Sequence, residues 1–365
     1  MRARLKKENL PGVLIAVSLI VLVLVYLKSI LIPLILALLL SVAVAPAVNW
    51  LKSKGWNKIV ASFTGIALVA LIFSFLSYLI ISELGEFNDR QDQIMNKMAH
   101  YNNLLIEKFR GNRIGESLVR IYKKEVTTEE YLTEFFENSS GSLQASFDFI
   151  VNVALIPIYM FFFLVYSDFF IFGIRRMFKD FDTSNYIKLI DSSKRAIQSY
   201  FQGFVKVTLI LAVLNCIGLY IIGVENALFY GVFAALLCII PYIGIFIGSL
   251  LPAFMALITL DSPWYAVAVI GWMSFVQFLE GNFITPFVVG DKVKINPFMV
   301  LIFLLIAGKI WGIPGLVVAV PMAAVFKQIC EHVPFLAPLG SLMHSFPEDP
   351  EKTKNKRLRV SEVST

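Results

Sequence analysis

The sequence predicts an all-α protein that crosses a lipid bilayer about six to eight times. Of its 365 residues, 58% are hydrophobic and only 16% are charged, whereas soluble domains carry about 25% charged residues. A helix of roughly 20 apolar residues spans the hydrocarbon core and satisfies its own backbone there. Six windows of 18 to 24 residues contain no Asp, Glu, Lys or Arg: 9–27, 29–51, 59–82, 149–167, 207–224 and 262–279.

Charge and cysteine usage exclude several other classes of protein. The net charge is +6, but the basic residues border the apolar windows, which indicates contact with anionic headgroups and not with nucleic acid. The three cysteines have no CxxC spacing, so neither a disulfide framework nor a metal site is expected. Walker A, HExxH, GxSxG and GxGxxG motifs are absent from the sequence. We therefore expect no cofactor and no enzymatic activity.

The first half of the chain is predicted to hold four membrane helices and an insert. Residues 1–82 form three helices, the first two joined by a tight turn at Lys28-Ser29. The basic N-terminus and the lysine-rich loop after the second helix belong in the cytoplasm. Residues 83–147 then form a small extracytoplasmic helical insert, and 148–206 return through a fourth helix to a basic cytoplasmic stretch. Apolar residues recur at helical spacing in the insert, at Ile94, Met98, Tyr101, Leu105 and Phe109.

The second half contains two interrupted apolar runs, which we expect to form the transport core, 207–330. Residues 226–260 carry no charge, and as one helix they would measure about 52 Å, more than the roughly 30 Å hydrocarbon core. Pro241 and Gly244 interrupt this run. The run 295–326 is interrupted in the same way, at Gly308, Gly312, Pro314 and Gly315.

Short paired arms around such breaks favour re-entrant hairpins. Two hairpins give six crossings, and one hairpin with two thin crossings in 226–260 gives eight; both counts place both termini in the cytoplasm. Residues 331–365 are expected to form a cytoplasmic tail with a disordered end.

Few polar side chains interrupt the apolar second half, and these are the candidate solute or ion ligands. Gln277 and Glu280 are three residues apart and share one helical face, followed by Asn282. A carboxylate near lipid usually faces a cavity or a partner, although Glu280 could instead mark a membrane boundary. Lys309 lies in the second break, where it could meet an anion or simply reach water. The break residues could present helix ends and unpaired carbonyls to a solute.

The second half also resembles the autoinducer-2 exporter family of bacterial membrane proteins. The resemblance covers 199–330 and departs from the family at Ile245, Asn296 and Lys309. It is carried by Ser199-Tyr200-Phe201-Gln202-Gly203, Ile240-Pro241-Tyr242-Ile243-Gly244, Gln277, Glu280-Gly281-Asn282, Pro286, Gly290, Asn296-Pro297, Ala307-Gly308, Gly312, Gly315 and Pro321.

The resemblance implies export of a small polar solute, elevator-like movement and a homo-oligomer in the bacterial cytoplasmic membrane, with pentamers suggested for relatives. Some relatives are linked to exchange of sodium or lithium for protons. The leading hypothesis is therefore a secondary transporter of a small polar solute, and the second is a sodium (lithium)/proton antiporter that uses Glu280. Hypotheses of other classes are a scaffold for envelope assembly built around 83–147, or a channel.

Overall fold

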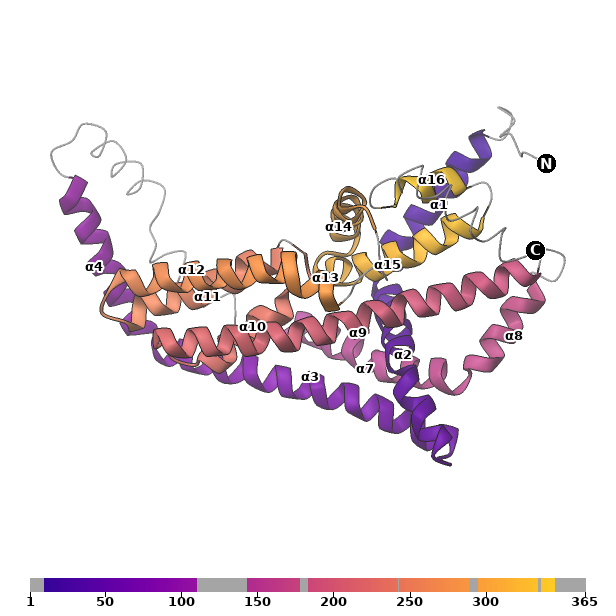
Figure 1. Ribbon diagram of the computed structural model, residues 1–365, viewed down its shortest axis with the longest axis horizontal. Helices are drawn as coiled ribbons and strands as arrows, with labels where there is room; N and C mark the ends of the chain where they lie inside the picture. The colour runs from indigo at the N-terminus through magenta and orange to yellow at the C-terminus, as the bar shows by residue number, and fades with distance from the viewer. Residues whose placement is uncertain are drawn as a thin grey trace, which may run out of the picture. The chain divides into compact units, whose positions relative to one another are not determined.

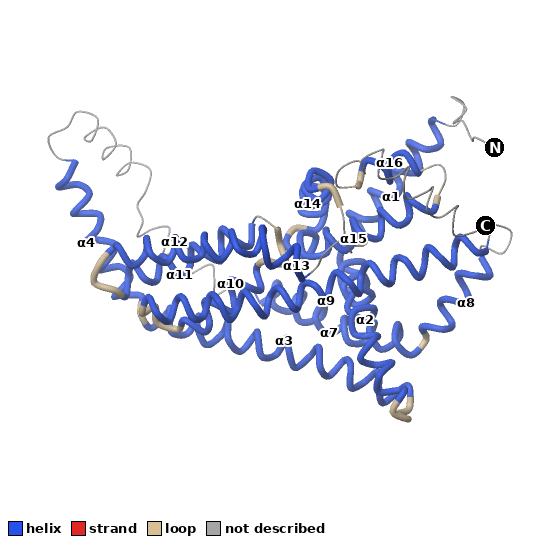
Figure 2. Tube along the Cα trace, viewed as in Figure 1, coloured by secondary structure: helices blue, strands red, loops and turns tan. Residues whose placement is uncertain are grey.

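The computed structural model describes residues 10–109, 143–177, 183–241, 243–288, 295–333 and 336–344. Within these ranges all regular secondary structure is helical and no strand is present (Figure 1 and Figure 2). Five helices are long and apolar enough to cross a membrane, or six if one bent pair is counted as a single span. The predicted all-α fold of a multi-pass membrane protein is confirmed.

The chain divides into two compact units. One unit comprises Met1–Ile66, Leu155–Lys206 and Phe283–Thr365, and the other comprises Ala67–Ala154 and Val207–Asn282. The first has a core of Leu39, Ile197, Trp311 and Val318. The second has a larger core that includes Leu219, Tyr230, Ala256 and Val269.

The first two helices, α1 (Leu10–Tyr26) and α2 (Lys28–Ser53), are separated by the single residue Leu27. The predicted turn at Lys28-Ser29 is therefore wrong, because both residues lie in the first turn of α2. Backbone hydrogen bonding continues through the junction, from Leu27 N to Val23 O and from Leu31 N to Leu27 O, each 2.9 Å. A polar turn is unnecessary when the backbone donors and acceptors are already paired.

The described part of the predicted insert packs on the rest of its unit. The third helix, α3 (Lys58–Asp89), extends into the insert, and α4 (Gln91–Phe109) follows. Ile94 is fully buried, and the Tyr101 hydroxyl donates to the carbonyl of Leu257 at 3.4 Å. The helix expected from the apolar spacing is thus present up to Phe109. The remainder of the insert to 142 lies outside the described residues.

Three helices come next in the chain: α7 (Leu143–Val165), α8 (Ser167–Met177) and α9 (Thr183–Ile222). The first of them begins inside the range 83–147 that was predicted for the insert. The apolar part of α7 and the first part of α8 meet at an angle of 69°. The long helix α9 carries the predicted window 207–224 in its second half.

The first interrupted run folds as two helices, α10 (Ala227–Leu237) and α11 (Ile243–Thr259), that pack against each other. Asn226, which precedes α10, adopts a left-handed backbone with φ of 54°. Its side-chain nitrogen donates to Oε2 of Glu83 at 3.0 Å, and the Tyr230 hydroxyl donates to Oε1 of the same carboxylate. Glu83 on α3 thereby fastens the beginning of the hairpin.

A longer apolar segment follows this hairpin. It begins with α12 (Pro263–Leu279), continues through a π-helical turn, Glu280–Ile284, and ends with α13 (Thr285–Val288). Ser262 caps α12 by accepting from the amide of Trp264 at 3.4 Å. Pro263 suits the first helical position because its missing N–H would have no partner there.

The second interrupted run folds as α14 (Pro297–Trp311) and α15 (Ile313–His332), and α16 (Ala337–Leu342) follows. Asn296 caps α14 by accepting from the amide of Phe298 at 3.0 Å, which gives this departure from the family a structural role. α15 is long enough to cross a membrane by itself, whereas α14 is not. The part of the predicted tail from 345 onward lies outside the described residues.

Both hairpins close on a glycine in the first turn of their second helix. A Cβ at Gly244 would lie 1.7 Å from the carbonyl oxygen of Leu237, and one at Gly315 would lie 2.0 Å from that of Ala307. Gly312 separates α14 from α15 in one residue with φ of 63°, a conformation that only glycine adopts readily. In each hairpin, a glycine in the first turn of the second helix therefore allows that helix to approach the first one closely.

We predict that α4 lies outside the cytoplasm and the loop after α2 lies inside, because basic residues concentrate in that loop. Single cysteines at Asn103 and Ser53, in a protein without its three native cysteines, would measure this in intact cells. A membrane-impermeant maleimide should label Asn103→Cys and spare Ser53→Cys. The reverse labelling would invert the orientation of the whole chain.

Candidate functional site

The three polar residues expected near the end of α12 lie in its last turn and in the π-helical turn that follows it. Gln277 Nε2 donates to Glu280 Oε2 at 2.7 Å, so the predicted i,i+3 pair is in direct contact. Glu280 opens the π-helical turn, and such turns recur at functional sites because they change the direction of side chains within a helix. Asn282 is exposed, and its side-chain nitrogen donates to the carbonyl of Phe278 at 2.9 Å.

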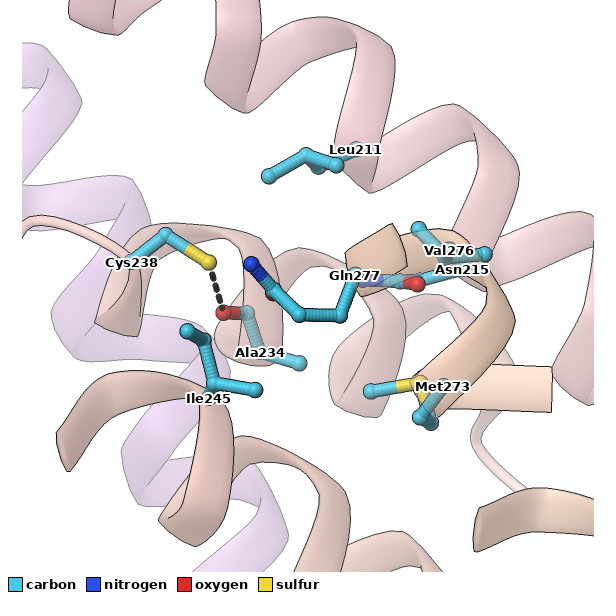
Figure 3. A pocket seen from close by; sticks show the side chains of 8 residues that line it. All are labelled: Leu211, Asn215, Ala234, Cys238, Ile245, Met273, Val276 and Gln277. Atoms are coloured by element: carbon cyan, nitrogen blue, oxygen red, sulfur yellow. Dashed lines mark hydrogen bonds between the residues drawn. The ribbon is translucent and has the colours of Figure 1, made fainter. Parts of the chain in front are cut away.

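A small, partly open cavity lies beside Gln277, lined by residues of α9, α10, α11 and α12 and of the break after α10. Figure 3 shows the side chain of Gln277 extending into it toward Cys238. The Cys238 thiol donates to the carbonyl oxygen of Ala234 at 3.5 Å. The volume of the cavity is about 20 Å³. Its lining consists of Leu211, Asn215, Ala234, Cys238, Ile245, Met273, Val276 and Gln277.

Asn215 is the residue that sequence reasoning missed. It lines the cavity and is only 4% exposed, yet its side-chain oxygen has no hydrogen-bond partner in the described structure. Leaving a buried acceptor unpaired costs about 1–3 kcal/mol, so such a group calls for an explanation beyond stability. The available signal was weak: Asn215 is the sole carboxamide in the uncharged window 207–224.

The packing of α9 on α12 explains why Asn215 and Gln277 lie at the same cavity. The Trp272 indole nitrogen donates to the carbonyl of Leu214 at 3.2 Å. A Cβ at Gly218 would lie 1.9 Å from the same indole nitrogen, so a glycine is needed for this approach. Because Gln277 is more than one turn beyond Trp272, it meets α9 nearer the beginning of that helix, at the level of Leu211 and Asn215.

The other predicted site residues belong to the hairpins. Pro241 lies in the break between α10 and α11, and the departure Ile245 lines the cavity. Gly308, Gly312, Pro314 and Gly315 lie at the junction of α14 and α15. Lys309 is exposed in the last turn of α14 and belongs to the other compact unit from Gln277 and Glu280.

The site offers oxygen ligands and one carboxylate. Asn215, Gln277 and Glu280 supply side-chain oxygens, which suit hydroxyl or ammonium donors and hard cations such as sodium. Among the described residues, no group of three or more His, Cys, Asp or Glu side chains could hold a metal ion. A cavity of 20 Å³ holds about one water-sized species, since a water needs roughly 10–15 Å³.

Comparison with known proteins identifies relatives over most of the chain. A family model described as AI-2E family transporter matches residues 14–335. YrrI of Bacillus subtilis, named as a candidate transport protein, is 26% identical over 84% of this chain and 87% of its own length. YueF of the same species is 27% identical over 83% and 84%, respectively. YhhT of Escherichia coli is 26% identical over 82% of this chain and 83% of its own. Both carry the same description as YrrI.

Proposed function

Because the chain belongs to the AI-2E family of transporters, we propose that it is a secondary transporter that exports a small polar solute and binds it beside Gln277 and Glu280. The observation that carries this proposal is the unpartnered oxygen of Asn215 in a cavity shared with Gln277. A solute with hydroxyl or amine groups would donate a hydrogen bond to this oxygen and so replace the bond to water that the oxygen lost on burial. The resemblance to autoinducer-2 exporters suggests a compact, polyhydroxylated solute.

The cavity of about 20 Å³ is far smaller than the roughly 300–1,000 Å³ of pockets for drug-sized ligands. Solute binding therefore requires α10 and α11 to move away from α12. The close approach of α10 and α11 at Gly244 favours movement of the hairpin as one body. The proposal also includes elevator-like movement and assembly into a homo-oligomer such as a pentamer. It places the protein in the bacterial cytoplasmic membrane with both termini in the cytoplasm.

Sodium or lithium exchange for protons is the second candidate function, and the volume of the cavity favours it. One dehydrated cation fits a cavity of about 20 Å³ that Asn215 and Gln277 line, and their carboxamide oxygens would have to turn toward it to serve as neutral ligands. Glu280, which is in contact with Gln277, would be the carboxylate that binds a proton and a cation in turn. In solute export, the same carboxylate would bind the solute or couple its movement to an ion.

Purified protein in liposomes separates these functions. Export predicts release of a loaded polar solute, such as autoinducer-2, at a rate well above that of empty liposomes. Antiport predicts an internal pH change when sodium or lithium is added outside, without solute release. Flux of neither kind from correctly assembled protein would contradict both functions and favour the scaffold.

Asn215→Leu is expected to stabilise the protein and impair transport. The free energy of unfolding should rise by about 1–3 kcal/mol, because an unpaired buried polar group is removed. Transport should fall by about tenfold or more, because one hydrogen bond to the cargo is lost. Thermal unfolding and liposome flux measure the two effects. Ile217→Leu, at an exposed position of α9, should change neither. Lower stability with normal flux would make Asn215 a structural residue.

A further inference from the structure

The helix α8 is too short to cross a bilayer and lies at a steep angle to the helix before it. Its 11 residues measure about 16 Å, against roughly 30 Å of hydrocarbon. Tyr166 alone separates it from α7, and the angle between the two helices is 69°. Because membrane helices tilt by only about 20° on average, a crossing by α7 places α8 closer to the membrane plane than to the membrane normal.

The outer surface of α8 is aromatic and carries charge as well. Phe169 is 68% exposed and Phe172 is 62% exposed, whereas the ring of Phe170 packs at 5.7 Å from that of Phe163 on α7. Asp168 and Arg176 are also exposed. Amphipathic helices that combine exposed aromatic residues with charged residues are typical of the headgroup layer, where the aromatic rings enter the acyl region.

Lysines from three other helices, Lys52 of α2, Lys58 of α3 and Lys194 of α9, act on the acidic residue at the beginning of α8. Lys58 Nζ forms an ion pair with Asp168 Oδ2 at 2.7 Å. This hydrogen bond and the charge of Lys58 hold the pKa of Asp168 below its usual value, and Lys52 and Lys194 lower the pKa further. Lys58 thus contacts the carboxylate directly, the charges of Lys52 and Lys194 also act on it, and the sum of the four charges is positive. We call Lys52, Lys58 and Lys194 the basic cluster.

Exposed tryptophans flank the basic cluster. Trp50 ends the apolar part of α2 and Trp56 precedes α3, and both side chains are exposed. Lys54 Nζ lies 5.8 Å from the centre of the Trp50 ring. Tryptophan next to lysine at the end of an apolar helix indicates the interface between membrane and water. This combination favours a lipid over a second protein as the occupant of the surface.

We propose that α8 lies in the cytoplasmic headgroup layer, with Phe169 and Phe172 in the acyl boundary, and that the basic cluster binds the phosphate of an anionic phospholipid. The ion pair between Lys58 and Asp168 fixes α8 against the beginning of α3, while Lys52 and Lys194 supply the charge for the lipid. This inference stands apart from the transported species, because it involves none of the residues of the cavity.

Lipid binding is tested with purified protein in nanodiscs of phosphatidylcholine, with and without phosphatidylglycerol. The double variant Lys52→Gln/Lys194→Gln leaves the ion pair between Lys58 and Asp168 intact. Its affinity for phosphatidylglycerol should be lower than that of the wild type by about tenfold or more, because each basic residue near an anionic surface adds to the affinity for that surface. The control Lys28→Gln/Lys97→Gln loses the same charge elsewhere and should bind like the wild type. Equal binding by both double variants would overturn the proposal.

The position of α8 is measured with a bimane probe on Phe172→Cys in a protein without native cysteines. Quenching by phospholipids with brominated acyl chains, and not by aqueous iodide, is expected. Quenching by iodide alone would place α8 in water. Protection from both quenchers together with cross-linking between copies would show that a second copy covers this surface. Either of the last two results would overturn the proposal.

Discussion

Replacing Gly244 by Ala is expected to prevent the first hairpin from closing. The added methyl group would lie 1.7 Å from the carbonyl oxygen of Leu237 and 2.3 Å from its carbonyl carbon. A side-chain neighbour could rotate away, but backbone atoms of a helix cannot move without separating α11 from α10. We therefore expect the free energy of unfolding to fall by about 3 kcal/mol or more. Thermal unfolding in detergent and the yield of monodisperse protein measure this loss.

Gly271→Ala is the matched control for this substitution. Gly271 lies inside α12, and nothing surrounds its Cβ position within 4 Å. The same methyl group should there be neutral or stabilise the helix by up to about 1 kcal/mol, because alanine favours a helix over glycine. Equal unfolding temperatures for Gly244→Ala and the wild type would mean that α10 and α11 do not pack closely in the membrane.

The helices were predictable because lipid leaves the backbone few alternatives. A segment without charges that is long enough to span the bilayer must be helical. The interruption between α14 and α15 was also predictable, because Gly312 and Pro314 favour the end of one helix and the beginning of the next. The junction between α1 and α2 was predicted one residue too late, at Lys28-Ser29, because backbone hydrogen bonds continue through Leu27 and the polar residues belong to the first turn of α2.

The contacts between helices could not be read from hydropathy. Asn215 and Gln277 meet at one cavity although they are 62 positions apart in the chain. Likewise, Glu83 was assigned only to a charged insert, whereas it accepts from both Asn226 and Tyr230. Apolar periodicity indicates that a segment is helical but leaves open which neighbour each side of it meets. The pair of Gln277 and Glu280 could be anticipated because both residues belong to the same helical segment, where spacing determines proximity.

Replacing Glu280 by Gln is expected to abolish most transport while leaving the fold intact. The substitution keeps the shape of the side chain, and its amide oxygen can still accept from Gln277 Nε2, which now donates to Oε2 of Glu280 at 2.7 Å. What disappears is the negative charge beside the cavity. A hydrogen bond to a charged group contributes about 1.5–3 kcal/mol, so loss of this charge from a bound solute or cation should slow transport by about tenfold or more.

Liposome flux at several pH values, with and without sodium, measures this effect, and size-exclusion chromatography checks assembly. Asp92→Asn removes the same charge from an exposed position in the first turn of α4 and should transport like the wild type. Glu280→Asp keeps the charge but shortens the side chain, so it should retain the pH and sodium dependence at a reduced rate. If Glu280→Gln transports at the wild-type rate with unchanged ion dependence, the carboxylate serves only to end α12, and the cargo must be bound without it.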